Sequence, residues 1–436
     1  METLINTEMY FFDGNDGFFY IHFPVRGYAV KTNHNNIDVL YKLKNKVPLD
    51  GVEEKSILVI NLKSKGLIGE AGRLDEINKN VIEFKPVEAT LLLTENCNLS
   101  CNYCYARASQ VSTYPAMTKG IAKIAVDFIV ENAKSHKHKC AEFRFLGGGE
   151  PTTEWDLLVW ITNYIKFKSN ETGVKHWIRL ITNGIALSKN KIRWLSENIQ
   201  YVTLSCDILP DLQMSRAFPN GKNSHGRVMH SAKVISQYNI PCHFRTTISI
   251  AGSDRMKEMV EYTNKYTNIK AIRFEPIADI GRASDNKMVL PRQQDFVNNF
   301  IDAYKLGRRY GILVTCKMMT NIWRRSRRFC NVEFSVTSNG SIVGCHRYSI
   351  NNGFEYDLFH IGNITQDKIE LNLMKVEEIK NIDVSYFSEC KYCFAKWSCA
   401  SGCLSARLNN GEINKKSSIC YITKELLKFS IKEALS

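Results

Sequence analysis

The sequence predicts an α/β protein in which a partial (β/α)6 TIM-like barrel stands between a winged-helix-like N-terminal module and a cysteine-rich C-terminal region. Two observations predict this fold class. Six apolar strand segments alternate with helical segments in the middle of the chain, as in a parallel sheet. The fourteen cysteines are unevenly spread, and eight of them fall in the last third. With 436 residues, the chain is long enough for the three expected domains, at 1–84, 85–309 and 310–436.

The N-terminal module is expected to consist of strands followed by helices. Two apolar segments, MYFFDG and FFYIHF, flank a GNDG turn, and RGYAVKT supplies a third strand. The segments NIDVLYKLKN and VEEKSILVINLKSKGLIGE then carry apolar residues at helical spacing. We expect the second helix to end near Gly66. Three strands followed by helices predict the winged-helix-like unit.

The middle of the chain supplies the strands of the expected barrel. They are EATLLLTE, EFRFLGG, WIRLITNG, YVTLSCD, CHFRTTISI and AIRFEPI. Between the first two strands, a predicted helix carries one apolar face, which consists of Ile121, Ile124, Ala125, Phe128 and Ile129. Because the chemistry of such barrels sits at the carboxyl ends of the strands, the loops that follow the strands are the candidate sites.

Three cysteines, Cys97, Cys101 and Cys104, follow the first strand within eight positions. Cubane iron–sulfur clusters are normally held by four cysteine thiolates, so three ligands leave one iron open to a small molecule. A zinc site is the alternative interpretation. The C-x3-C-x2-C spacing, with Tyr103 before the last cysteine, resembles the signature of the radical S-adenosylmethionine (radical SAM) superfamily. That resemblance implies a 4Fe–4S cluster whose open iron binds the amino and carboxylate groups of S-adenosylmethionine.

Further polar groups resemble the cofactor contacts of that superfamily. Its GGE motif is matched after the second strand by Gly148, Gly149 and Glu150. Glycines let the backbone approach the methionine amino group, and the glutamate could complement the ammonium charge. The candidate contacts to the ribose or the carboxylate lie at the ends of strands three and four and on strand five: Thr182, Asn183, Ser205, Asp207 and Arg245. Each of these residues also has an ordinary structural interpretation.

The C-terminal cysteines have the spacing of a second known domain. They are Cys330, Cys345, Cys390, Cys393, Cys399, Cys403 and Cys420. This pattern resembles the seven-cysteine SPASM domain, which binds two auxiliary 4Fe–4S clusters. By that resemblance the inner auxiliary cluster takes Cys330, Cys345 and Cys403, and the outer one takes the other four cysteines. A zinc ribbon is the alternative, but it explains only residues 390 to 403.

The inner cluster lacks a fourth cysteine at the usual place. Sulfatase-maturating relatives have an extra cysteine a few residues before the first SPASM cysteine, where this chain has RRSRR. Cys316, fourteen residues upstream of Cys330, is a candidate substitute. Otherwise an iron stays open and could take a substrate thiolate. The same relatives carry an aspartate directly after the second SPASM cysteine, where this chain has His346. This departure argues against sulfatase maturation.

The first module resembles the peptide-recognition element of enzymes that modify ribosomally synthesised peptides (RiPPs), chiefly in its two helical segments. In that element the leader of a precursor peptide adds as a strand to the third strand, here around RGYAVKT. The resemblance implies a precursor peptide, bound through its leader, as a partner. An unrelated winged-helix module is the alternative.

Charge and composition limit the setting. The net charge of +14 favours acidic partners, such as a peptide or an electron donor of the flavodoxin or ferredoxin kind, although solvated charged faces explain it equally well. The chain has no run of eighteen apolar residues, and its first residues lack the features of a signal peptide. We therefore expect a cytoplasmic protein with reduced thiols, with neither a membrane nor a nucleic acid as partner.

These resemblances together predict a radical SAM/SPASM enzyme that modifies a precursor peptide. Reductive cleavage of S-adenosylmethionine would supply a 5′-deoxyadenosyl radical, which takes a hydrogen atom from the peptide. The expected product is an intrapeptide crosslink, either a C–S thioether or a C–C bond, and no catalytic side chain is assigned. The rivals are a maturase of a folded protein or of a small cofactor precursor, and a non-catalytic zinc- or cluster-binding interaction module.

Overall fold

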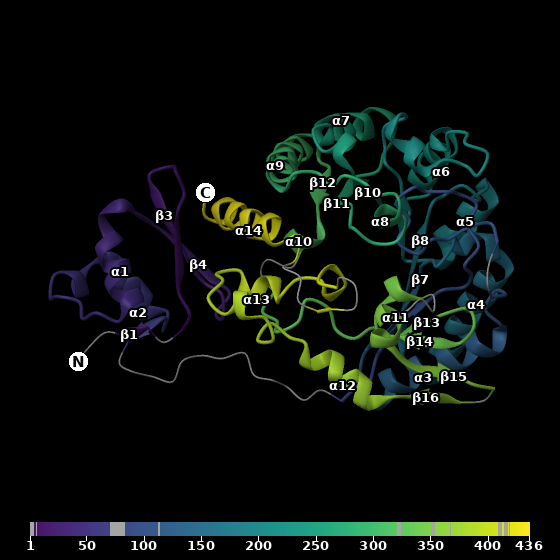
Figure 1. Cartoon of the computed structure of the whole chain (residues 1–436), viewed down its shortest axis with the longest axis horizontal. Coiled ribbons are helices and arrows are strands. Elements are labelled where there is room, and N and C mark those ends of the chain that lie inside the picture. Colours follow the sequence, from purple (N-terminus) through teal and green to yellow (C-terminus); the bar gives the residue numbers. More distant parts are fainter. Residues whose placement is uncertain are drawn as a thin grey trace.

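One sheet of eleven strands forms the centre of the molecule in the computed structural model (Figure 1). The structure describes residues 4–5, 7–69, 83–111, 114–320, 324–349, 354–366, 368–408, 412–413, 417 and 419–436. Seven neighbouring strands of the sheet are parallel: β6 (Glu88–Leu91), β7 (Cys140–Phe145), β8 (Lys175–Thr182), β9 (Tyr201–Ser205), β10 (Cys242–Ile248), β11 (Ala271–Pro276) and β12 (Leu313–Thr315). The six expected strands are β6 to β11, and β12 extends them.

Helices cover the outer side of this curved sheet (Figure 1). They are α3 (Lys119–Ser135), α4 (Trp155–Thr172), α5 (Lys189–Asn198), α6 (His225–Gln237), α7 (Met256–Tyr266) and α9 (Gln293–Tyr310). Strand order follows chain order from β6 to β12, so each helix connects two neighbouring parallel strands. The sheet does not close on itself, and the prediction of a partial barrel is therefore confirmed.

The apolar face of α3 differs in detail from the expected one. Ala125 and Ile129 are buried as expected, but Ile121, Ile124 and Phe128 are only half-buried. The fully buried face of α3 consists of Ala122, Ala125, Val126, Ile129, Val130 and Ala133. Phe128 instead faces the C-terminal region, where it packs on Phe334 with 5.1 Å between the ring centroids.

The region after residue 310 continues the central sheet. β13 (Ser335–Val336) lies parallel to β6, and three antiparallel strands follow it: β14 (Ser341–Val343), β15 (His360–Ile364) and β16 (Ile369–Leu371). The helices of this region are α10 (Lys317–Thr320), α11 (Phe354–Phe359), α12 (Leu373–Asn381), α13 (Lys396–Cys399) and α14 (Cys420–Leu435). The cysteine-rich region thus shares strands and core with the barrel.

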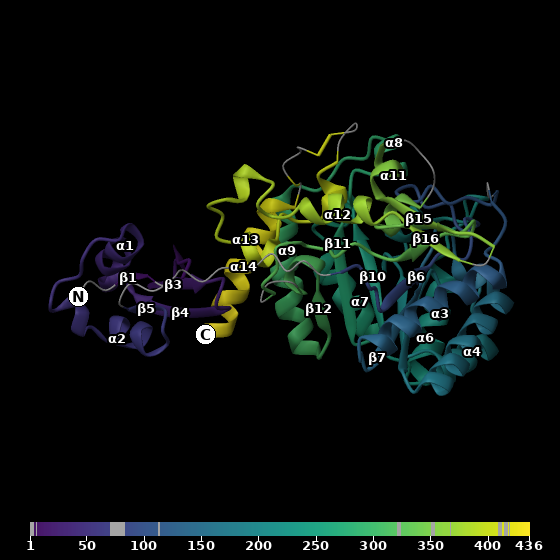
Figure 2. The ribbon, with the colours of Figure 1, turned by 90° about the horizontal axis from the view of Figure 1, so that it is seen from below.

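The N-terminal module lies at one end of the molecule, beside α14 (Figure 2). It has the expected three antiparallel strands and two helices: β2 (Tyr10–Asp13), β3 (Phe18–Phe23), β4 (Tyr28–Asn33), α1 (Ile37–Asn45) and α2 (Ile57–Ser64). β1 (Leu4–Ile5) pairs with β5 (Ile68–Gly69). α2 ends before Gly66, which has a φ of 66°, as expected. Glu70, at the end of the segment that carries this helix, lies outside the described residues.

The module is attached to the C-terminal region by apolar and charged contacts. Tyr20 of β3 packs with Leu427 and Ile431 of α14. Glu8 accepts a hydrogen bond from Trp397 Nε1 at 3.0 Å. The described part of the chain contains no helix that is both long and apolar enough to span a bilayer.

Candidate metal centres

The barrel thiol group consists of Cys97, Cys101 and Cys104, on the loop after β6 at the carboxyl edge of the sheet. The loop is held by the backbone, since Cys97 N–H donates to the Ser109 carbonyl at 2.7 Å. Burial raises the pKa of Cys97 to about 12 and that of Cys101 to about 11, and the neighbouring thiols contribute to both shifts. These thiols are protonated at neutral pH, so a metal group would have to release their protons on binding.

A distant segment holds this loop from the other side. It is the stretch 281–286, which contains α8 (Arg282–Asp285). Arg282 Nη1 donates to the Cys101 carbonyl at 2.7 Å, and Arg282 N–H donates to the Cys104 carbonyl at 3.0 Å. Gly281 has a φ of 57°, and a Cβ there would lie 2.5 Å from the Cys104 oxygen. This contact comes from residues 181 positions later, and no sequence motif pointed to it.

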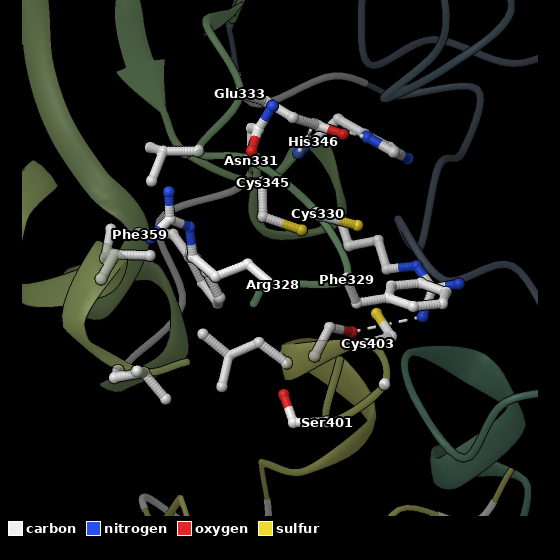
Figure 3. Close-up of a pocket in the computed structure, with 18 of the residues that line it drawn as sticks. Arg328, Phe329, Cys330, Asn331, Glu333, Cys345, His346, Phe359, Ser401 and Cys403 are labelled. Atoms are coloured by element: carbon white, nitrogen blue, oxygen red, sulfur yellow. Dashed lines mark hydrogen bonds and ion pairs between the residues drawn. The ribbon is translucent and has the colours of Figure 1, made fainter. Parts of the chain in front are cut away.

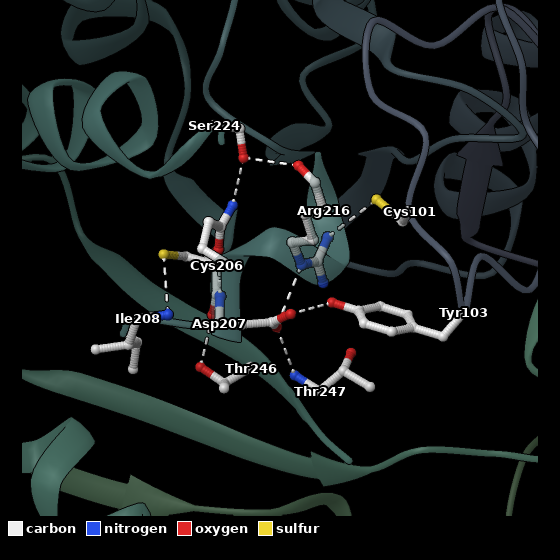
Figure 4. A network of polar contacts seen from close by, with 10 residues as sticks. Cys101, Tyr103, Cys206, Asp207, Ile208, Arg216, Ser224, Thr246 and Thr247 are labelled. Carbon is white, nitrogen blue, oxygen red and sulfur yellow. Dashed lines mark hydrogen bonds and ion pairs between the residues drawn. The ribbon is translucent and has the colours of Figure 1, made fainter. Parts of the chain in front are cut away.

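A buried arginine lies beside the same thiols (Figure 4). Arg216 Nη1 is 4.0 Å from Cys101 Sγ, and Arg216 Nε is 3.2 Å from Asp207 Oδ1. Tyr103 donates its hydroxyl hydrogen to the other carboxylate oxygen of Asp207. The Asp207 side chain is only 4% exposed, so the acid expected to contact the ribose is engaged inside the protein. Arg216 was missed by the sequence analysis because it lies in a loop without recognisable spacing.

The glycines of the GGE motif are required by the cysteine loop itself. A Cβ on Gly149 would lie 1.9 Å from the carbonyl oxygen of Asn96, the residue before the first cysteine of the barrel thiol group. A Cβ on Gly148 would lie 3.1 Å from the Thr94 carbonyl oxygen. The absence of a side chain on these glycines therefore lets the backbone of the motif lie close to the backbone of the cysteine loop.

Glu150 joins two strand ends. Its carboxylate accepts hydrogen bonds from Thr182 Oγ1 at 2.6 Å, from Asn183 N–H at 2.7 Å, and from the hydroxyl and N–H of Thr152 at 2.6 and 3.1 Å. Burial raises the pKa of Glu150, and these hydrogen bonds oppose that shift. Three of these donors bind Oε1 and one binds Oε2, so Oε2 can accept one further donor, such as the expected ammonium group.

The other predicted contacts gather at the same edge. Asn183 Nδ2 lies 3.9 Å from Cys97 Sγ and donates to Asn98 Oδ1 at 2.8 Å. Ser205 and Arg245 are register partners on β9 and β10, and both are half-buried. The predicted residues therefore surround the barrel thiol group from strands β7 to β10.

The inner thiol group consists of Cys330, Cys345 and Cys403, which line one open cavity of about 650 Å³ (Figure 3). Lys317 Nζ lies 3.5 Å from Cys330 Sγ. Burial raises the pKa of Cys345 well above its usual range. Burial alone would raise the pKa of Cys403 too, but Arg347 and Lys317 lower it. The three thiols thus share one cavity with three cationic side chains, Lys317, Arg328 and Arg347.

Cys316 and His346 both bear on the fourth ligand of the inner cluster, and they lie in different parts of the structure. Cys316 is fully buried in the main core, and burial raises its pKa to about 12. Its neighbour Lys317 lines the inner cavity, but Cys316 is not among the described residues that do so. His346 lines the cavity, and its Nδ1 lies 2.8 Å from Oε2 of the half-buried Glu333. Its ring lies edge-on to Tyr105, with 6.0 Å between centroids.

The outer thiol group lines a second open cavity, of about 530 Å³. Its members are Cys390, Cys393, Cys399 and Cys420. Burial raises the pKa of Cys390 to about 11 and that of Cys399 to about 12, and the other thiols of the group add to both shifts. Arg407, which lines the same cavity, was also missed by the sequence analysis.

The basic RRSRR stretch is largely structural. Arg325 Nη1 donates to the Val25 carbonyl at 3.1 Å, and Arg328 Nη1 donates to the Lys380 carbonyl at 3.1 Å. Arg327 pairs with the buried Asp383 at 2.7 Å. These arginines join the stretch to the N-terminal module, to α12 and to Asp383, which follows α12. Separately, a group of three His, Cys, Asp or Glu side chains arranged around a single metal ion is not found among the described residues.

We compared the chain with known proteins. Residues 91–263 match the family model described as the radical SAM superfamily. The chain is 22% identical to the cysteine-type anaerobic sulfatase-maturating enzyme of Clostridium novyi (strain NT), over 71% of this chain and 85% of that enzyme.

Two solved structures share the fold. One, native anSMEcpe with bound AdoMet and Cp18Cys peptide, is 19% identical and has a TM-score of 0.64 over 80% of this chain and 98% of its own. The other, Streptococcus suis SuiB bound to S-adenosylmethionine, is 15% identical and has a TM-score of 0.50 over 96% of this chain and 99% of its own. The chain therefore carries a radical SAM domain over residues 91–263 and is related to the anaerobic sulfatase-maturating enzymes.

Proposed function

We propose that this chain is a radical SAM/SPASM peptide maturase with three 4Fe–4S clusters, one on each thiol group. The observation that carries the proposal is the separation of ten cysteines into groups of three, three and four. Four thiolates complete the ligation of a cubane, whereas three leave one iron for another ligand. The barrel thiol group is the site for S-adenosylmethionine, because it lies at the carboxyl edge of the sheet within the matched domain.

The side chains around the barrel thiol group support a cofactor that carries an amino acid. Arg216 and Arg245 are guanidinium groups suited to a carboxylate. We assign the remaining polar contacts to Gly148, Gly149, Thr182, Asn183 and Ser205. Glu150 and Asp207 hold these elements in position, since their oxygens are engaged by the chain. When bound and reduced, the cofactor supplies a radical that can take a hydrogen atom from an unactivated carbon.

The substrate we propose is a precursor peptide whose leader adds to β4. In the sheet order β2-β3-β4, this strand is at an edge, and no described strand pairs with its outer side. Such an edge can accept an extended peptide through main-chain hydrogen bonds. Lys31 is exposed on β4 and would favour an acidic leader. The anSMEcpe structure with a bound peptide is consistent with a peptide substrate.

The proposed product is an intrapeptide crosslink, a C–S thioether or a C–C bond. The inner thiol group supports the first, because its three thiols leave a position for a substrate thiolate. We place the reaction in the cytoplasm and propose a flavodoxin- or ferredoxin-type electron donor. Sulfatase maturation is the second candidate, favoured by the relationship over 71% of the chain. His346 argues against it.

The deciding experiment is anaerobic purification with iron, sulfide and zinc analysis. Three cubanes give about twelve irons per chain, whereas an interaction module of the zinc-ribbon type gives a few zincs. The loaded enzyme is then incubated with S-adenosylmethionine, a reductant and either the precursor peptide or a sulfatase peptide. We expect 5′-deoxyadenosine and a crosslinked precursor that has lost two hydrogen atoms. Oxidation of the sulfatase peptide alone would establish the second candidate.

Recognition of the leader has a separate test. Full-length precursor and precursor without its leader are titrated against the loaded enzyme. We expect binding to weaken at least about tenfold without the leader, because its main-chain hydrogen bonds to β4 are lost. A second arm removes residues 1–84, which should weaken precursor binding and leave unproductive cofactor cleavage intact. Equal affinity for both peptides would remove the peptide-recognition role from this module.

A further inference from the structure

Each thiol group has a cationic side chain within hydrogen-bond reach of one of its sulfurs. At the barrel group, Arg216 Nη1 lies 4.0 Å from Cys101 Sγ. At the inner group, the cation is Lys317, 3.5 Å from Cys330. At the outer group, Arg407 Nη2 lies 3.6 Å from Cys390 Sγ. A positive charge this close to a ligand acts on the electron affinity of any cluster the ligand holds.

The three cations differ in how far their charge is cancelled or screened. Arg216 Nε lies 3.2 Å from Oδ1 of Asp207, whose side chain is only 4% exposed, so the two groups form an ion pair shielded from solvent. Lys317 reaches a cysteine that is exposed to solvent, and Arg328 and Arg347 line the same cavity. The Arg407 side chain is 0% exposed, whereas the side chain of its partner Glu389 is 40% exposed. The charge of Glu389 is therefore screened by water, and that of Arg407 is not.

Arg407 is fixed in this position by several groups. Its Nε donates to the Ser401 carbonyl at 2.5 Å, its Nη1 lies 2.7 Å from Glu389 Oε1, and its guanidinium lies 3.8 Å from the ring centroid of Phe387. Ser401 and its neighbours Ala400 and Gly402 all have positive φ, of 67°, 47° and 76°. Non-glycine residues in that region are strained, and the strained turn presents the carbonyl that accepts from Arg407.

We propose that Arg407 raises the reduction potential of the outer cluster. Reduction adds one negative charge to the cluster, and an unscreened buried cation stabilises the reduced state over the oxidised state. This inference rests on the proposed function, because it requires a cluster on the outer thiol group. Arg407 acts through Cys390, so it is a positioning and electrostatic residue.

The test compares two substitutions that remove opposite charges from one ion pair. In the reconstituted full chain, the midpoint potential of the outer cluster is measured by EPR-monitored redox titration, and its signal is identified by its loss in Cys393→Ala. We expect Arg407→Gln to lower the potential, Glu389→Gln to raise it, and Arg407→Lys to stay closest to wild type. A tenfold change in the reduced-to-oxidised ratio corresponds to about 59 mV for one electron.

A matched control and the iron content separate the outcomes. Arg308 and Glu433 form another arginine–carboxylate pair, at 3.0 Å, whose members do not line either thiol cavity. Arg308→Gln should leave the potential unchanged. If Arg407→Gln loses the cluster, Glu389→Gln still carries the test. The role of Arg407 would be overturned if Arg407→Gln and Glu389→Gln shifted the midpoint potential in the same direction. It would also be overturned if the potential did not shift in proteins that hold about twelve irons. Absence of the outer cluster from the wild-type protein would instead overturn the proposed function.

Discussion

The barrel thiol group and the two C-terminal thiol groups are built in different ways. The three barrel cysteines come from one short loop, and the contacts that hold it come from β7, Arg216 and the segment 281–286. The seven C-terminal cysteines come from residues 330 to 420, and most of them lie in loops or short elements, such as the four-residue α13, whereas Cys420 begins α14. The barrel site is therefore positioned by the sheet, whereas the C-terminal sites depend more on the groups they bind.

The largest expected effect is the loss of chemistry without loss of the C-terminal clusters. Changing Cys97, Cys101 and Cys104 together to Ala should abolish cleavage of S-adenosylmethionine and leave about two-thirds of the iron, because the ligand sets are separate. Iron analysis and 5′-deoxyadenosine measurement check this. Continued formation of 5′-deoxyadenosine would show that the chemistry occurs elsewhere.

Removal of iron should affect the two regions unequally. In the chelated protein, we expect hydrogen exchange around α13 to accelerate by about tenfold or more, since short elements without their metal group open locally. Exchange in β7 and β8 should change little, because each of these strands is hydrogen-bonded to a neighbouring strand on both sides. If hydrogen exchange accelerated equally around α13 and in β7 and β8, the C-terminal sites would not depend on their metal groups more than the barrel site does.

A pair of glycine substitutions sharpens the account of the barrel site. Gly281 and Gly311 both have positive φ, of 57° and 65°, but a Cβ on Gly311 would meet nothing within 4 Å. Gly311→Ala should cost about 1 kcal/mol of stability. Gly281→Ala should cost more, about 2–3 kcal/mol, and should also reduce loading of the barrel cluster, because it displaces the cysteine loop. Thermal unfolding and iron content measure both effects.

The smallest expected effect concerns Cys316. Because it lies in the main core, Cys316→Ala should cost about 1 kcal/mol in the free energy of unfolding and leave all cluster spectra unchanged. In that variant, added precursor should still perturb the spectrum of the inner cluster if a substrate thiolate binds there. A changed spectrum in the absence of peptide would make Cys316 the fourth ligand.

The sequence supported the fold and the cysteine groups because both depend on local patterns. Strand–helix alternation located β6 to β11, and the resemblance to the SPASM domain divided the cysteines into the two groups that line the C-terminal cavities. Arg216, Arg282 and Arg407 could not be found this way, since each meets its cysteine only through the tertiary fold. The sequence also did not show that the backbone of the cysteine loop lies close to the GGE glycines. Local spacing identifies ligands but not the groups that surround them.

The pairing of β6 with β13 has a consequence for the synthesis of the chain. β6 carries the barrel thiol group on its following loop, and one of its two edges is covered only when β13 has been made. The two strands are roughly 240 residues apart, so at about 5–20 residues per second the edge waits for roughly 12–50 s on the ribosome. Unpaired strand edges are prone to aggregation. The cluster loop therefore belongs to the part of the barrel that completes its fold last, and cluster insertion has a time window before the sheet is complete.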